Sequence, residues 1–247
     1  MTEKAEEKQY RCPGESYTIS DSVCRGRQRV NYPKCNVCLE KVEPGGFAQS
    51  HAEPKLSINI FKSYDIRGKY PSELNDTTAH KIGTSIALFF REKNPDVKNI
   101  VVGRDMRLSS KSLANALIEG LCTAGLNVIN VGVVSSEMTY FAVGHYKYDG
   151  GVMVTASHNP AEYNGFKLCR EQAIPVSFET GIDRISKLTK QYHPLRGEHL
   201  GKVRVTDIFV DYKKHVLKFA SNLRHLRVVI DAGNGMAGKT IPLVCEG

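Results

Sequence analysis

The sequence contains no tryptophan, no block of lysine and arginine, and no apolar core of a secretory signal at its start. Its first residues read MTEKAEEKQYRC and are charged throughout. Seven cysteines, an odd number, in a chain without an export signal argue against a disulfide framework and predict a cytoplasmic protein. Because 41% of the 247 residues are hydrophobic and 24% are charged, we exclude a disordered chain and expect one to two folded domains.

One stretch has the apolar content of a membrane span, because Glu119 is the only charge between Leu113 and Val134. Asparagines and glycines interrupt it, and at Gly125 the pattern changes from helical spacing to a run of branched residues. A helix followed by a strand explains this pattern better than a bilayer span. We therefore expect no membrane partner.

The chain is basic, with 34 lysines and arginines against 26 acidic residues and a net charge of +8. This surplus fits an anionic small-molecule substrate as well as nucleic acid, and it is equally compatible with a mildly basic soluble protein. The locally basic N-terminal region carries no aromatic platform for bases, so nucleic acid is not an expected partner. The sequence makes no prediction of the oligomeric state.

The N-terminal 1–55 differ from the rest, because they hold four of the seven cysteines and no run long enough for a buried helix. Residues 42–54, VEPGGFAQSHAEP, read as a linker. Cys35 and Cys38 have the spacing of a zinc thiolate pair, which Cys12 and Cys24 would complete as a structural Zn²⁺ site. The alternative is a tail with four reduced thiols.

From residue 58 onward, apolar strands alternate with amphipathic helices at about 25–30 residues per unit, which predicts an α/β fold with a mostly parallel mixed sheet covered by helices. We expect this domain at 56–200 and the start of a second, similar domain at 201–247, which ends within its helix and is therefore truncated. The expected strands lie at 58–61, 99–103, 127–134, 150–157 and 226–235, and the expected helices at 77–93, 110–124, 137–147, 178–192 and 208–220.

The most informative segment is VTASHNPAEYNGFK, residues 154–167. A buried strand precedes Ser157, which places its hydroxyl at the carboxyl end of a strand, where open α/β sheets bind ligands. Pro160 prevents the strand from continuing. The segment is not the G-x-S-x-G turn of hydrolases, and the sequence contains no G-x-x-x-x-G-K-[ST] phosphate loop.

These residues resemble those of the α-D-phosphohexomutases, the phosphoglucomutase/phosphomannomutase family. TASHNP at 155–160 and YNGFK at 163–167 resemble its phosphoserine loop, and YDIRG at 64–68 resembles its first active-site motif. VGRDMRLSS at 102–110 resembles its strand-to-helix segment, and DAGNGMAG at 231–238 the start of its second domain. YNGFK favours the phosphomannomutase/phosphoglucomutase branch over the phosphoglucosamine branch.

The resemblance implies an intramolecular phosphotransferase that interconverts the 1-phosphate and 6-phosphate of mannose, glucose or both. Ser157 would carry the phosphoryl group, donate it to a hexose phosphate, and retrieve a different one after the bisphosphate intermediate reorients. A hexose 1,6-bisphosphate would act as activator. A phosphoserine holds about −1.5 to −2 charges at neutral pH, so it needs cations and hydrogen-bond donors nearby.

The same resemblance assigns roles to the neighbouring side chains. Arg67 would pair with phosphate oxygens through its planar guanidinium. Lys167 would either transfer the proton of the sugar hydroxyl or act as a fixed positive charge. His158 would either transfer a proton or orient the serine, the alternative being an ordinary hydrogen-bonded loop histidine. Tyr64 would contact sugar or phosphate, or else cap the core.

Three further groups of residues complete the prediction. Asn159 and Asn164 would bind substrate or shape the loop, and Arg104, Asp105 and Arg107 would form an ion-pair network that supports the site. The family holds Mg²⁺ through the phosphate on its serine, here Ser157, and an aspartate loop of D-G-D-G-D type. The sequence contains no such loop, and we expect residues 1–247 alone to be inactive. The alternative function is a zinc-binding module fused to a catalytically inactive mutase-like domain.

Overall fold

The computed structural model describes residues 9–11, 18–20, 58–194, 200–220 and 227–245. The chain divides into two compact units, residues 1–53 and 54–247. In the first unit, β1 (Gln9–Arg11) and β2 (Thr18–Ser20) pair antiparallel. The four cysteines of the expected zinc site, Cys12, Cys24, Cys35 and Cys38, lie outside the described residues, so the zinc site stays a prediction.

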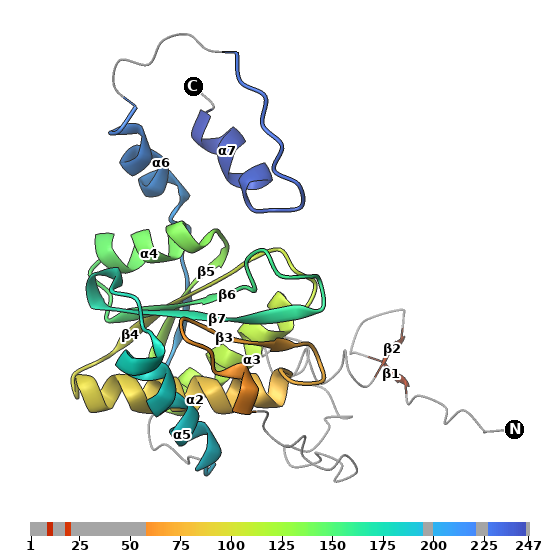
Figure 1. Ribbon diagram of the computed structural model, residues 1–247, viewed down its shortest axis with the longest axis vertical. Coiled ribbons are helices and arrows are strands. Elements are labelled where there is room, and N and C mark those ends of the chain that lie inside the picture. The colour runs from red at the N-terminus through yellow and green to blue at the C-terminus, as the bar shows by residue number, and fades with distance from the viewer. Residues whose placement is uncertain (1–8, 12–17, 21–57, 195–199, 221–226, 246–247) are drawn as a thin grey trace, which may run out of the picture. The chain divides into compact units, whose positions relative to one another are not determined.

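The second unit is built on a six-stranded mixed sheet with the strand order β3-β7-β6-β4-β5-β8 (Figure 1). The pairs β4–β6, β4–β5 and β5–β8 are parallel, whereas β7 runs antiparallel to both of its neighbours, β6 and β3. This architecture confirms the expected α/β class. The strands are β3 (Ile66–Lys69), β4 (Asn99–Arg104), β5 (Asn127–Val133), β6 (Gly150–Val154), β7 (Tyr163–Arg170) and β8 (Val203–Val205).

Helices cover both faces of this sheet (Figure 1). Two long helices, packed against each other, cover one face, and α4 covers the other. A single π-helical turn, η4 (Phe178–Ile182), leads into the helix that packs on α2. The α-helices are α2 (Asp76–Lys93), α3 (Ser110–Thr123), α4 (Ser136–His145), α5 (Asp183–Lys190), α6 (Phe209–Leu217) and α7 (Ala237–Cys245).

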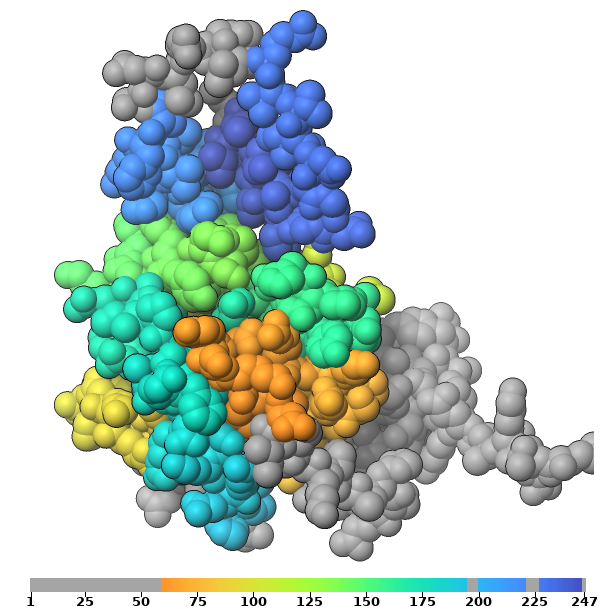
Figure 2. All heavy atoms as spheres, in the orientation of Figure 1, coloured from red at the N-terminus to blue at the C-terminus, as the bar shows by residue number. Residues whose placement is uncertain are grey.

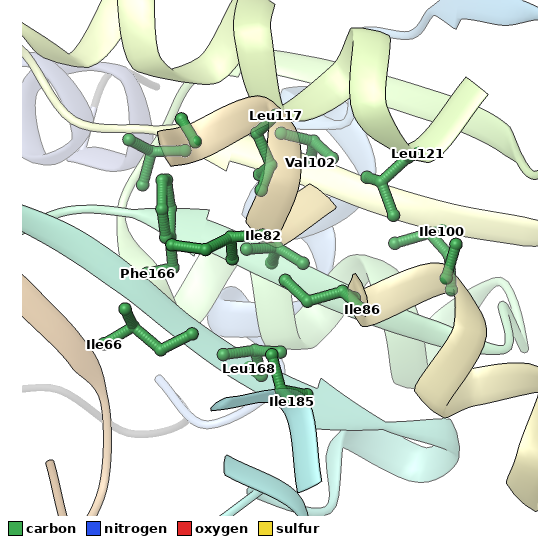
Figure 3. Packing of buried hydrophobic residues seen from close by; sticks show 14 of the residues in the cluster. Ile66, Ile82, Ile86, Ile100, Val102, Leu117, Leu121, Phe166, Leu168 and Ile185 are labelled. Carbon is green, nitrogen blue, oxygen red and sulfur yellow. The ribbon is translucent and has the colours of Figure 1, made fainter. Parts of the chain in front are cut away.

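Alternation along the strands divides the core into two layers, because successive side chains of a strand point to opposite faces. On the face covered by α2 and α3, Phe166 and Leu168 of β7 pack with Ile82 and Ile86 of α2 (Figure 3). On the opposite face, Met153 of β6 and Cys169 of β7 pack with Met138, Ala142 and Val143 of α4. The polar residues of the sheet that carry chemistry must therefore lie beyond these layers, at its edge and its strand ends.

The apolar stretch that we interpreted as a helix and a strand has that structure, since α3 ends at Thr123 and β5 begins at Asn127. The chain reverses at Gly125, whose φ of 83° lies in the left-handed region that favours glycine. The Leu126 N–H then donates to the Leu121 carbonyl at 3.1 Å, which closes the helix end. Among the described residues, no helix is long and apolar enough to cross a membrane.

Two local expectations were wrong. Residues 58–60 form a 3-10 turn, η2 (Ile58–Ile60), because an apolar run this short does not specify a strand. Residues 227–235 form no strand, since no described strand lies beside them to complete a ladder. The helix expected at 77–93 begins one residue earlier, at Asp76, after the N-cap Asn75, whose Oδ1 accepts the Thr78 N–H at 3.0 Å.

β3 is an edge strand, and in Figure 2 the orange atoms of its segment lie on the molecular surface. It was not expected from the sequence, nor was β7. Both strands are needed for the site, because Ile66 pairs with Phe166 and thereby brings YDIRG beside YNGFK.

Burial of thiols and phenols predicts that the fold loses stability at alkaline pH. Burial raises the pKa of the Cys169 thiol from 9.0 to about 12, and that of the Tyr140 phenol from 10.0 to about 12. A group whose pKa is raised in the folded state stabilises the fold fully below its unfolded pKa. That contribution is lost as the pH rises through the folded value. We expect the unfolding free energy to fall from about pH 9 to pH 12.

Urea unfolding between pH 7 and pH 11 checks this expectation. Cys169→Ala should make the decline shallower, whereas Cys245→Ala, at an exposed cysteine, should leave it unchanged. Equal slopes in the wild type and Cys169→Ala would show that this thiol does not contribute.

Candidate active site

The loop between β6 and β7 carries Ser157 at the carboxyl end of β6. β6 ends at Val154, and the Thr155 N–H still donates to the Gly165 carbonyl at 2.9 Å. The chain then turns at Ala156, whose carbonyl accepts the Asn159 N–H at 3.0 Å. Ser157 is thus held only three residues beyond a buried strand, which gives its exposed hydroxyl a rigid base.

The backbone of Ser157 is in the left-handed region, with φ of 54°. This conformation costs a non-glycine residue roughly 1–2 kcal/mol. The Ser157 N–H is bound in place by the Thr155 hydroxyl, at 2.9 Å. A strained residue persists only where its surroundings hold it, and such residues cluster at functional sites.

Asp105, immediately after β4, is the anchor of the loop. Its carboxylate is buried and accepts hydrogen bonds from the Thr155 hydroxyl at 2.7 Å, the Arg107 N–H at 3.0 Å and the Ser110 hydroxyl. It also forms an ion pair with Arg107, whose Nε lies 3.3 Å from Oδ2. One carboxylate therefore joins the end of β4, the start of α3 and the residue that holds the Ser157 amide.

Arg107 binds the loop through its carbonyl oxygens. Nη1 donates to Pro160 at 2.7 Å and to Tyr163 at 3.0 Å. Nη2 donates to Ser157 at 2.8 Å and to Asn159 at 2.6 Å. The planar guanidinium thus fixes four peptide units of the loop at once.

Arg104, Asp105 and Arg107 were expected to form one ion-pair network, but they make two different kinds of contact. The ion pair within the trio joins Arg107 to Asp105, whereas Arg104 donates from Nη1 to the Asp105 backbone carbonyl at 3.3 Å.

Asn164 ties the start of β7 to the start of α3. Its side chain is fully buried, and Nδ2 donates to the hydroxyls of Ser109 at 2.8 Å and Ser110 at 2.9 Å. Its Oδ1 accepts the Gly165 N–H at 2.8 Å. With its amide bound in this way and removed from the surface, Asn164 shapes the loop, and the expected substrate contact does not fit its position.

Arg67 and Lys167 come from the two strands beside the loop. Ile66 and Phe166 point into the core with α2 and α3, so their neighbours Arg67 and Lys167 point to the opposite face of the sheet. Val154 belongs to the same core layer as Ile66 and Phe166, so the side chain of the next residue, Thr155, points to the same face as Arg67 and Lys167. Both cations are partly exposed, and Arg67 lies 3.9 Å from Asp65 as an ion pair.

Gly165 of β7 is the direct partner of Arg67 in the ladder and must be a glycine. A Cβ atom at this position would lie 2.2 Å from the Ile66 carbonyl oxygen and 3.1 Å from the Cα of Arg67. The missing side chain lets β3 approach β7 closely, which keeps Arg67 in register with the strand that follows the Ser157 loop.

Ser157 lines a cavity of about 720 Å³. Asp105, Arg107, Thr155 and Asn159 line it from the loop side, and Asn234 lines it from the segment before α7. The volume is that of a small-molecule site.

The other candidates, Arg67, Lys167, His158 and Tyr64, are not among the residues that line this cavity. His158 is exposed beside Ser157, and the side chain of Tyr64 is 77% exposed. Tyr64 is therefore not a cap on the core, and its contact with sugar or phosphate stays a prediction. Sequence reasoning missed Thr155 and Ser110, although the T-x-S spacing was a usable signal for a hydroxyl bound to a backbone amide.

The residues described by the structure do not assemble a metal site. In that part of the chain, no group of three or more His, Cys, Asp or Glu side chains is placed to hold an ion. The Mg²⁺ implied by the resemblance therefore finds no ligand set among these residues, and we derive no chemical step through it.

Comparison with known proteins identifies relatives over this unit. The family model described as phosphoglucomutase/phosphomannomutase, alpha/beta/alpha domain I, matches residues 59–195. A phosphomannomutase of Vibrio cholerae is 40% identical over 186 residues, which cover 74% of this chain and 40% of that protein. A phosphomannomutase of Escherichia coli is 41% identical over 189 residues, with the same coverage. The chain spans about 40% of the length of these curated relatives.

Solved structures agree with the sequence comparison. A phosphoglucomutase/phosphomannomutase family protein from Burkholderia thailandensis superimposes with a TM-score of 0.65 at 30% identity, over 76% of this chain and 42% of that one. A crystal structure titled putative phosphomannomutase, from Thermus thermophilus, gives a TM-score of 0.57 at 28% identity, over 64% of this chain and 35% of that one.

Proposed function

Because this chain belongs to the phosphoglucomutase/phosphomannomutase family, we propose that it is the phosphate-carrying part of a hexose phosphate mutase. The reaction is the interconversion of hexose 1-phosphate and hexose 6-phosphate through a phosphate on Ser157. The substrate class is mannose phosphate, glucose phosphate or both. A cytoplasmic location and the domain boundaries at residues 55 and 200 stay predictions.

The observation that supports this proposal best is the way the loop presents Ser157. A left-handed serine, with its N–H bound by Thr155 and its carbonyl bound by Arg107, leaves only its hydroxyl free toward a cavity. Phosphoryl transfer requires little covalent work from a protein, so rate comes from positioning and from charge. The rigidly held hydroxyl would supply the positioning, and Arg67 and Lys167, which point to the same face of the sheet as Thr155, would supply the charge.

In the proposed step, a hydroxyl oxygen of the hexose phosphate attacks the phosphorus of phosphorylated Ser157. A new O–P bond forms as the Oγ–P bond breaks, and the product is a hexose bisphosphate. The sugar hydroxyl loses its proton and Ser157 Oγ gains one, so the step is balanced in protons. Lys167 or His158 transfers these protons, or Lys167 acts as a fixed charge on the phosphoryl group in flight. Arg67 neutralises phosphate oxygens.

Mass spectrometry of Ser157 tests the proposal. Protein purified from its own cells should carry phosphate on Ser157, and this phosphate should exchange with labelled glucose 1,6-bisphosphate or mannose 1,6-bisphosphate. The exchange should leave the exposed Ser72 unlabelled, which serves as an internal control. An unphosphorylated Ser157, together with no mutase activity, would favour the alternative of a zinc-binding module fused to an inactive mutase-like domain.

A further inference from the structure

The four contacts of Arg107 also determine where the loop N–H groups point. In a trans peptide unit the C=O and N–H groups point in opposite directions. Arg107 draws the Ser157 and Pro160 carbonyls toward itself, so the N–H groups of the same peptide units, those of His158 and Ala161, point away from it. The Asn159 carbonyl belongs to the peptide unit of Pro160, which has no N–H.

These two N–H groups are donors without an acceptor. Neither His158 nor Ala161 donates a backbone hydrogen bond to any atom in the described part of the chain. By contrast, the two neighbouring donors are bound, Ser157 to the Thr155 hydroxyl at 2.9 Å and Asn159 to the Ala156 carbonyl at 3.0 Å. The loop thus keeps bound donors beside free ones, and Ala161 lines the same cavity as Ser157.

We propose that Arg107 is a positioning residue, which turns the His158 and Ala161 N–H groups outward so that they bind the phosphate carried by Ser157. The inference rests on the proposed function, because that function supplies the phosphate. Only Cβ and Oγ separate the Cα of a phosphoserine from its phosphorus, so the phosphate stays within reach of the neighbouring amides. Backbone N–H groups gathered in a turn form a concave anion site.

The contacts of the Arg107 guanidinium explain why we assign the phosphate to the two N–H groups and not to Arg107 itself. The guanidinium of Arg107 is paired with Asp105 and bound by four carbonyls, so its own donors are used within the protein. The phosphate oxygens are strong acceptors and form charge-assisted bonds with N–H donors. Arg107 therefore acts on the phosphate through the peptide units.

The test installs phosphoserine at position 157 of the full chain during translation, so that it does not depend on self-phosphorylation or on turnover. Amide ¹H–¹⁵N spectra of this protein are compared with those of the unmodified protein. We expect the His158 and Ala161 amide protons to move downfield, and further than that of Asn159, whose N–H is already bound. A shift absent from His158 and Ala161, or no larger than that of Asn159, would overturn the proposal.

A variant pair then assigns the effect to Arg107. In Arg107→Lys, an ammonium cannot bind four separated carbonyls, so the downfield shifts should be lost. Arg104→Lys changes a neighbouring arginine that donates to the Asp105 carbonyl, and should retain them. The phosphate titration followed by ³¹P resonance gives a second readout. Hydrogen bonds to the dianion lower its pKa below the usual value of about 6, and Arg107→Lys should raise it again.

The outcomes distinguish the positioning role of Arg107 from the proposed mutase function. Shifts retained in Arg107→Lys would contradict the positioning role even if the wild-type amides bind the phosphate. If Arg107→Lys does not fold, the wild-type comparison still decides whether the two amides bind it. Failure of Ser157 to exchange phosphate with a hexose bisphosphate would instead remove the proposed function and leave this binding result intact.

Discussion

Replacing Ser157 by alanine is expected to lower mutase turnover by at least about a thousand-fold, because the variant has no oxygen to carry the phosphoryl group. Ser157 is the exposed hydroxyl of the loop, and the Thr155 hydroxyl is buried and bound to Asp105 at 2.7 Å. The loop therefore offers no second exposed hydroxyl to carry the phosphoryl group. The measurement is the conversion of mannose 1-phosphate and glucose 1-phosphate by the protein as its own cells make it.

Ser72→Ala is the matched control, because Ser72 is an exposed serine in a turn outside the site, and it should retain full turnover. Labelling by hexose 1,6-bisphosphate should disappear in Ser157→Ala and persist in the control. Turnover of Ser157→Ala within about tenfold of the wild type would rule out the phosphoserine assignment.

The second large effect is expected from Asp105→Asn, which should lower the unfolding free energy by about 2–4 kcal/mol. The substitution keeps the shape but replaces one acceptor oxygen by an NH₂ donor. Whichever way the amide is turned, that donor faces another donor, either Thr155 or the Arg107 backbone, and Arg107 loses its ion-pair partner. Urea unfolding at neutral pH measures the loss.

Asp96→Asn, at an exposed aspartate, should change the unfolding free energy by less than about 0.5 kcal/mol. Limited proteolysis offers an independent readout, since Asp105→Asn should expose the peptide bonds between residues 155 and 163 to cleavage. An unfolding free energy equal to that of the wild type would show that the buried carboxylate does not anchor the loop.

The elements that could be predicted from the sequence are those with long, regular patterns. The periodic apolar positions of α2 and the continuous branched residues of β4 are local signals, and both elements were expected nearly within their observed bounds. β3 and β7 escaped prediction because they alternate polar and apolar residues and contain Gly68 and Gly165. Among the described strands they pair with each other and, in the case of β7, with β6. Their pairing is not a local property.

The candidate site also contains residues that local sequence patterns reveal and residues that depend on distant contacts. Ser157, Arg67 and Lys167 could be proposed from motifs, since their side chains carry recognisable chemistry, and their roles stay predictions. The role of Arg107 as the residue that binds the loop was not found, because its partners are backbone carbonyls about fifty positions away, and a carbonyl has no signature in a sequence. The burial of Asn164 was hidden for a similar reason, as it depends on hydroxyls at the start of α3.

The antiparallel pairing of β3 with β7 has a consequence for biosynthesis. Arg67 leaves the ribosome long before its partner strand, because Ile66 pairs with Phe166, one hundred positions later in the chain. Until β7 has emerged, the edge strand has no neighbour, and the segment that bears Arg67 cannot take its place beside the loop. Contacts this distant in sequence form late and slowly. The nascent chain can therefore assemble the helices α2 and α3 and the parallel strands β4, β5 and β6 first, and Arg67 takes its place in the sheet only after β7 has been added.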